Sequence, residues 1–291
     1  MSDVFLNRVT GLLIIEVRNS NPNGDPDNEG EPRQRQDKRG IVTGVSFKRK
    51  LRDLVELKDG PVWAELRREL EIGDADHYQI LESRGRSREE IKKLSKEEFQ
   101  KRYWDARVFG STFLESIRDD KDLRPEDVEH FIRTGVAQFA NGISVAPVVV
   151  ERMTTTNKPG VQEGKDRGIA PLGYRVVQHG VYCMPFFINP TAARRLGCEP
   201  KDIELLKRLI PYAYAHTRSH VRPSVEIRHA WYVEHESPLG SCSDFAILDA
   251  LMPRKRANPS EPSNIWEEYD VPSCIDTLEQ KGLRCIDLMV K

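Results

Sequence analysis

The sequence predicts an α+β fold of the ferredoxin-like type, with the element order βαββαβ. Apolar, β-branched runs and amphipathic stretches alternate as strand, helix, strand, strand, helix, strand. Two long excursions interrupt this order, at residues 60–103 and 154–172. Both are rich in charged or polar residues, which indicates insertions into the fold rather than further core elements.

The composition restricts the class of protein. The chain has 291 residues, 38% hydrophobic and 31% charged, which is enough apolar material for a core. Its net charge of −1 excludes a generally basic protein that coats nucleic acid, so any such binding depends on local patches. Five scattered cysteines without a C-x-x-C motif indicate reduced thiols rather than disulfides or a zinc site. With no signal peptide and no membrane-spanning run, we expect a soluble cytoplasmic protein.

The first strand, predicted at residues 12–17, is followed by the loop "RNSNPNGDPDNEG" at residues 18–30. A calcium-binding loop centred on Gly24 is disfavoured, because the position of the closing bidentate glutamate is occupied by Gly30. A turn rich in Asn, Asp and Gly accounts for the composition, since these side chains hydrogen-bond to the backbone and tolerate positive φ.

An amphipathic helix is predicted next, beginning between residues 43 and 46. Its apolar stripe is Phe47, Leu51, Leu54 and Val55.

The same region carries the strongest local charge. Residues 33–52 hold eight basic side chains and one acidic side chain, a net charge of +7. Lys48, Arg49 and Arg52 share one arc beside the apolar stripe, whereas Lys50 lies elsewhere. In the first turns of a helix the backbone N–H groups favour an anion, and Ser46 adds a hydroxyl donor. We therefore predict phosphate binding, with a merely solvated helix face as the alternative. Because the three cations lie off the stripe, replacing them is expected to change stability little.

Residues 60–103 are predicted to be a helical insertion. Pro61 opens one helix, and two capping boxes open shorter ones, at Ser87 with Glu90 and at Ser95 with Glu98.

The remaining core elements follow this insertion. The runs "FIRTGVAQFANGISVAPVVVERM" and "GYRVVQHGVYCMPFFINP" are predicted strands. A helix is expected from residue 201 to residue 216, with Pro200 at its start and a kink at Pro211. "SVEIRHAWYVE" alternates like a half-buried strand with Val225, Ile227, His229, Trp231 and Val233 on one face. Residues 253–264 are expected to form a surface loop.

No catalytic constellation is evident. The seven histidines have no compact metal-ligand spacing, and no nucleophile elbow, P-loop or dinucleotide motif occurs. Asp25, Asp27 and Asp37 after the first strand suit metal-assisted phosphodiester cleavage, although turns also favour Asp for structural reasons. We predict no catalytic residues, no bound metal and no cofactor.

The motifs "RNSNPNGDPDNEG", "RQDKRGIVTGVSFKRKLRD", "ARVFGS", "GVAQFANGISVAPV" and "GYRVVQHGVYCMPFFINP" resemble a known family. It is the Cas7 family, the backbone subunits of CRISPR Cascade complexes in the RAMP superfamily, and the resemblance is to its subtype I-C (Csd-type) branch. The resemblance implies an RNA-recognition-like palm at residues 1–59 and 104–291. It further implies a helical finger at 60–103 and a protruding thumb at about 154–172.

The resemblance also implies a function in antiviral defence. Several copies would bind one guide RNA (crRNA) head to tail as a helical filament and present it for pairing with target DNA. Other partners would be the guide-processing, large and small subunits of the complex. The RNA-binding residues carried over from the family pattern are Arg18, Asn19, Asn21, Ser46, Lys48, Arg49, Arg52, Met153, Thr154, Thr155 and Thr156.

Two functions of different classes remain open at this point. The favoured one is a non-catalytic RNA-binding scaffold. The alternative is a metal-dependent ribonuclease that uses Asp25, Asp27 or Asp37, because related type III subunits cut target RNA with an aspartate in the loop after the first strand. A histidine-dependent guide-processing RNase is a third, weaker option, since another subunit has that role in this subtype.

Overall fold

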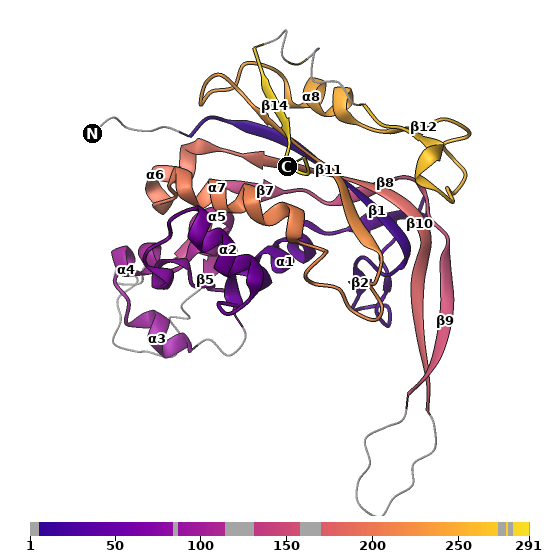
Figure 1. Cartoon of the computed structure of the whole chain (residues 1–291), viewed down its shortest axis with the longest axis horizontal. Helices are drawn as coiled ribbons and strands as arrows, with labels where there is room; N and C mark the ends of the chain where they lie inside the picture. Colours follow the sequence, from indigo (N-terminus) through magenta and orange to yellow (C-terminus); the bar gives the residue numbers. More distant parts are fainter. Residues whose placement is uncertain are drawn as a thin grey trace, which may run out of the picture.

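A computed structural model of the chain describes residues 6–83, 87–113, 131–157, 170–272, 278 and 282–290. One large antiparallel sheet runs through the molecule, with most helices on one face and α8 with the C-terminal segment on the other (Figure 1). Its strand order is β14-β11-β1-β10-β8-β4, and β7 and β9 also pair with β10. The strands are β1 Val9–Ser20, β4 Arg39–Val42, β7 Ala137–Phe139, β8 Gly142–Pro147, β9 Val150–Asn157, β10 Ala170–Ile188, β11 Val225–Glu234 and β14 Arg284–Asp287.

Shorter elements surround the sheet. Three two-stranded pairs are β2 Gly24–Asp25 with β3 Glu31–Pro32, β5 Gly110–Phe113 with β6 Phe131–Thr134, and β12 Arg254–Lys255 with β13 Tyr269–Asp270. The α-helices are α1 Gly44–Glu56, α2 Pro61–Glu69, α3 Arg88–Lys92, α4 Lys96–Arg102, α5 Trp104–Phe109, α6 Ala193–Leu196, α7 Pro200–Leu209 and α8 Asp244–Leu251. The 3-10 turns are η1 Ala75–Tyr78, η3 Pro190–Ala192, η4 Ile210–Tyr212 and η5 Trp266–Glu268. The predicted combination of helices with strands is thus confirmed.

Strand β1 is buried on both faces because the sheet separates two apolar clusters. Leu13, Ile15 and Val17 belong to the larger cluster, which also contains side chains of α1, α2 and α7. Leu12 and Ile14 belong to the second cluster, with α8 and the C-terminal segment. Burial on both faces explains why the strand reads as a continuous apolar run rather than an alternating one.

Helix α1 begins and packs as the sequence predicts. Thr43 is the N-cap, and its hydroxyl oxygen accepts a hydrogen bond from the Ser46 N–H at 3.2 Å. The predicted stripe is fully or almost fully buried: Phe47, Leu51 and Val55 have no exposed area, and Leu54 is 7% exposed.

The helices of residues 60–103 do not all lie apart from the core. Trp63 and Leu66 of α2 belong to the main apolar cluster, whereas Phe99 of α4 lies in a separate small cluster. The predicted capping box at Ser95 and Glu98 is reciprocal. At α3 the hydroxyl of the N-cap Ser87 accepts from the Glu90 N–H at 3.3 Å.

The helix predicted for residues 201–216 ends earlier than expected. Helix α7 ends at Leu209 and is followed by the 3-10 turn η4. Pro211 cannot donate a backbone hydrogen bond, and its ring clashes with the carbonyl four residues earlier. It therefore stops the α-helix instead of kinking it.

The predicted one-sided alternation of β11 is wrong beyond Ile227. The register against β1 shifts by one residue, because Ile15 lies opposite Ile227 while Ile14 lies opposite His229, which leaves Arg228 as a β-bulge. Ile227 therefore faces the main cluster, but Trp231 belongs to the cluster on the opposite face.

The excursion between the middle strands is built on a two-stranded ribbon. β9 pairs with β10 from Val150 opposite Val177 to Asn157 opposite Ala170, and this ribbon projects well beyond the sheet (Figure 1). Residues 158–169 of the predicted thumb lie outside the described residues.

No helix within the described residues has both the length and the apolar character needed to cross a membrane.

Candidate nucleic-acid interface

The predicted RNA-binding residues lie on three elements: the end of β1, helix α1 and the ribbon. Arg18 extends from β1 with 55% of its side chain exposed, and its Nε donates to Oε1 of the buried Glu16 at 2.6 Å. This hydrogen bond raises the pKa of the Arg18 guanidinium. Asn19 follows with an exposed side chain and a φ of +41°, a conformation that Asn adopts more readily than most residues. Both side chains are open to a ligand.

Asn21 has a different environment. It is 6% exposed, and its Nδ2 donates to the Gly30 carbonyl at 2.7 Å, which closes the loop of residues 21–30. Its Oδ1 is buried without a hydrogen-bond partner. Asn21 thus shapes the loop from inside, and an RNA contact by its side chain stays a prediction.

Asn23 connects this loop to the start of α1. Its Oδ1 accepts hydrogen bonds from the Thr43 N–H and from the Thr43 hydroxyl, both at 2.8 Å. Ser46, half-buried, lies in the first turn of the helix that Thr43 caps. The loop and the N-terminus of α1 are therefore positioned as one unit.

The cations of α1 are less available than the sequence predicts. Arg52 is only 9% exposed and donates from Nε to the buried Asp105 at 2.8 Å. Arg49 forms ion pairs with Asp53 at 2.6 Å and with Glu56. The expectation that all three cations lie off the packed surface is thus wrong for Arg52, because its partner is distant in sequence.

Two lysines of α1 lie against aromatic rings. Lys48 Nζ is 5.4 Å from the ring centre of Phe109, and Lys50 Nζ is 5.3 Å from that of Tyr214. Burial, with a smaller contribution from the Arg52 charge, lowers the pKa of Lys48 to about 8. Burial, then the Arg222 charge, lowers the pKa of Lys50 to about 8. Lys48 is half-buried, whereas Lys50, excluded from the predicted arc, is 6% exposed.

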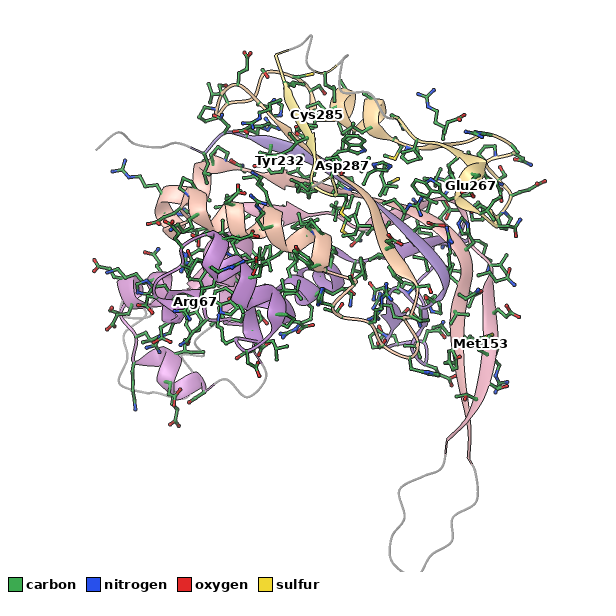
Figure 2. The ribbon with its side chains drawn as sticks, in the orientation of Figure 1. Arg67, Met153, Tyr232, Glu267, Cys285 and Asp287 are labelled. Carbon is green, nitrogen blue, oxygen red and sulfur yellow. The ribbon has the colours of Figure 1, made fainter. Side chains whose placement is uncertain are left out.

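The third element is the ribbon. Met153 lies on β9 opposite Tyr174 with 38% of its surface exposed, and Figure 2 shows it on the projecting part of the hairpin. Thr154 is exposed and Thr155 half-buried, while Thr156 pairs with Pro171.

Sequence reasoning missed two connections at the root of the ribbon. Arg175 of β10 forms an ion pair with Glu31 of β3, the residue directly after the loop of residues 18–30. The segment of residues 213–224, between η4 and β11, hydrogen-bonds to the end of β1 through the Asn21 N–H and the Val221 carbonyl at 2.7 Å. Its composition offered a signal, because it contains two arginines and two histidines and no acidic residue.

Two of the three loop aspartates are engaged in local ion pairs. Asp25 pairs with Arg33 at 3.0 Å, and Asp37 lies 3.7 Å from Arg35 and 3.8 Å from Arg39. Asp27 is exposed. Within the described part of the chain, no three His, Cys, Asp or Glu side chains gather closely enough to hold a metal ion.

Comparison with protein-family models identifies the class of protein. The model described as "CRISPR-associated protein Cas7" matches residues 7–273, which is most of the chain. The chain therefore belongs to the Cas7 family of CRISPR-associated proteins.

Solved structures give matches of low identity, and a search of curated proteins finds no match. A chain of a CRISPR RNA-guided surveillance complex in a pre-nicking state has a TM-score of 0.47 at 15% identity, with 78% of each chain covered. A second surveillance complex has a TM-score of 0.42 at 15% identity, covering 78% of this chain and 68% of the other. A type III-B Cmr-beta complex bound to cognate target RNA has a TM-score of 0.43 at 10% identity, covering 78% and 61%.

Proposed function

We propose that this protein is a non-catalytic, crRNA-binding backbone subunit of a cytoplasmic type I-C Cascade complex. Membership of the Cas7 family supports the general role. In this proposal several copies bind one guide RNA head to tail, and the filament presents the guide for pairing with target DNA. The other subunits of the complex bind to this filament.

One observation carries the proposal: the end of β1, the loop that follows it and the ribbon meet where the ribbon leaves the sheet. Ser20 at the end of β1 and Val150 at the start of β9 both lie opposite Val177 of β10. The end of the loop of residues 18–30 is attached to β10 through the ion pair between Glu31, the next residue, and Arg175. Exposed amide and guanidinium groups at such a junction suit a sugar-phosphate backbone, which is bound mainly by hydrogen bonds and charge.

The strand order supports an RNA-recognition-like, ferredoxin-like palm. Four strands lie in the order β11-β1-β10-β8, with α1 between β1 and β8 along the chain and α7 between β10 and β11. In this interpretation the ribbon is the base of the thumb, and residues 60–103 are the finger.

The proposed head-to-tail assembly can be tested directly. A heterologous contact that does not close gives an open helix, so the size of the complex should grow with RNA length. Sedimentation of the purified protein on short and long single-stranded RNA measures this. A species of fixed size on both RNAs contradicts the filament.

The alternative, a metal-dependent ribonuclease using Asp25, Asp27 or Asp37, is tested separately. Labelled RNA is incubated with the protein with and without Mg²⁺. We expect intact RNA in both, because the Asp25 and Asp37 carboxylates already face arginines. Mg²⁺-dependent cleavage that is lost in an Asp25→Asn, Asp27→Asn or Asp37→Asn variant would instead establish the nuclease.

A further inference from the structure

Residues 213–224 form a basic segment that the predicted RNA-binding set does not include. It carries His216, Arg218, His220 and Arg222 and no acidic residue, in a chain whose net charge is −1. Arg218 and His220 are exposed. Arg218 makes no hydrogen bond or ion pair with the described residues, which leaves all of its donors available.

This segment is held firmly against the predicted RNA-binding stretch of β1. The Arg18 N–H donates to the Ser224 carbonyl at 2.9 Å, and the Ser224 N–H donates to the Ser20 hydroxyl at 2.9 Å. Arg222 donates from Nε to the Asn21 carbonyl at 3.0 Å. The segment thus follows Arg18 to Asn21 as a backbone-paired neighbour, and the Arg222 side chain is anchored to Asn21.

The segment also contacts the other two elements of the interface. The ring of His220 meets that of Tyr174 on the ribbon edge to face, with centroids 5.2 Å apart. The buried Tyr214 at its start packs against Phe47 of α1 and lies beneath Lys50. It therefore bridges the ribbon and α1, on the side where β1 ends.

We infer that residues 213–224 are a further RNA-contacting element, in which Arg218 and His220 bind backbone phosphates of the strand that passes the root of the ribbon. This inference rests on the proposed function. An exposed guanidinium without a carboxylate partner, on a segment whose backbone is paired with the stretch from Arg18 to Asn21, suits a row of phosphates, which are bound by charge and hydrogen bonds.

Salt-dependent binding tests the inference. Arg218→Gln and wild type are titrated with a fluorescein-labelled single-stranded RNA of mixed sequence at several salt concentrations. Loss of one phosphate contact flattens the slope of log affinity against log salt by roughly 0.7. The ratio of the wild-type RNA affinity to that of Arg218→Gln should therefore fall about 2.5-fold between about 50 and about 200 mM salt. Arg218→Lys, which keeps the charge, should retain the wild-type slope.

Arg194→Gln is the matched control. Arg194 is exposed on α6, at the end of the molecule away from the ribbon, and makes no ion pair with the described residues (Figure 1). It should bind like wild type. Equal slopes for Arg218→Gln and a binding-competent wild type overturn this inference while leaving the proposed function standing. Equal losses in both variants also overturn it, since they indicate general charge attraction. If wild type itself holds no RNA, the proposed function and this inference fail together.

Discussion

Arg52 of α1 donates a hydrogen bond from Nε to Oδ2 of Asp105, 2.8 Å away, and both side chains are buried. Asp105 also accepts hydrogen bonds from the backbone N–H groups of Leu81 at 2.7 Å and Glu82 at 3.2 Å. One carboxylate thus joins α1, α5 and the segment before α3, and Arg52 neutralises it in a place with little access to water.

Arg52→Gln is therefore expected to destabilise the fold. Removing one partner of a buried ion pair leaves the other charge uncompensated, which costs about 3–5 kcal/mol of the free energy of unfolding. Urea denaturation followed by circular dichroism measures this loss.

Arg49→Gln is the control for this prediction. The Arg49 side chain is 34% exposed and its partners Asp53 and Glu56 are 44% and 33% exposed. Pairs of this kind contribute about 0.2–1 kcal/mol. Equally small losses for the two variants would contradict a structural role for Arg52.

The lowered pKa of Lys48 predicts that RNA binding depends on pH. Burial, together with the Arg52 charge, sets its pKa at about 8, so a phosphate contact through Lys48 weakens as the pH rises from 7 to 9. The sign for stability is the opposite. Since the folded pKa lies below the unfolded value of about 10.4, the unfolded chain binds more protons between the two, and this lysine's contribution to stability rises with pH there. A fall in RNA affinity over this pH range is therefore not explained by a loss of stability caused by Lys48.

In the Lys48→Arg variant the side chain stays charged up to pH 9. This variant is therefore expected to keep its affinity for RNA up to pH 9 in fluorescence-anisotropy titrations. Lys58→Arg provides the comparison, because burial lowers the pKa of Lys58 to about 8 as well, but its Nζ lies 3.7 Å from the ring centre of Trp63. It should leave the pH profile unchanged. A profile altered equally by both substitutions would argue against a contact at Lys48.

Asn23→Ala tests the connection between the loop and α1. The substitution removes the acceptor for the Thr43 N–H and hydroxyl, and leaving such groups unpaired costs about 1–3 kcal/mol. Thermal melting should show the loss, whereas Asn28→Ala, at an exposed position of the same loop, should melt like wild type. Matching melting temperatures for Asn23→Ala and wild type would mean that water replaces this contact without cost.

Replacement of residues 154–172 by a short Gly-Ser linker tests the ribbon. Thr154 and Thr155, the residues of this segment whose burial is described, belong to none of the apolar clusters, and the sequence of the segment is mainly polar. The fold should therefore survive, with a melting temperature close to that of wild type. Assembly on RNA should weaken, because the replacement removes Thr154, Thr155 and Thr156 and the part of the ribbon beyond Met153. Light scattering on a long RNA measures assembly, and an unchanged complex would show the projection to be dispensable.

The sequence was sufficient where the determining interactions are local. Thr43 and the spacing of Phe47, Leu51, Leu54 and Val55 predicted both the start and the buried face of α1. It was insufficient where a partner is remote. Asp105 lies 53 positions from Arg52, and charge patterning within one helix gives no indication of it.

The candidate interface shows the same division. The β-bulge at Arg228 depends on the pairing of β11 with β1, which a periodicity count does not register. Likewise, hydrogen bonds to Asn21, 201 positions from Arg222, bring the basic segment 213–224 to the β1 terminus. The predicted RNA contacts of the three elements remain predictions until binding is measured.

Strand β10 continues without interruption from Ala170 on the projecting ribbon to Ile188 inside the sheet, where Val181, Met184 and Phe186 are almost fully buried. One end of this strand is thus fixed in the core, and the other end projects from the sheet. At the root of the ribbon Val177 is paired with Ser20 on one side and with Val150 on the other, which restricts bending there. The direction of the ribbon is therefore set by core packing rather than by a hinge, so any repeat length that copies of this protein impose on a bound strand is inherited from the interior of each subunit.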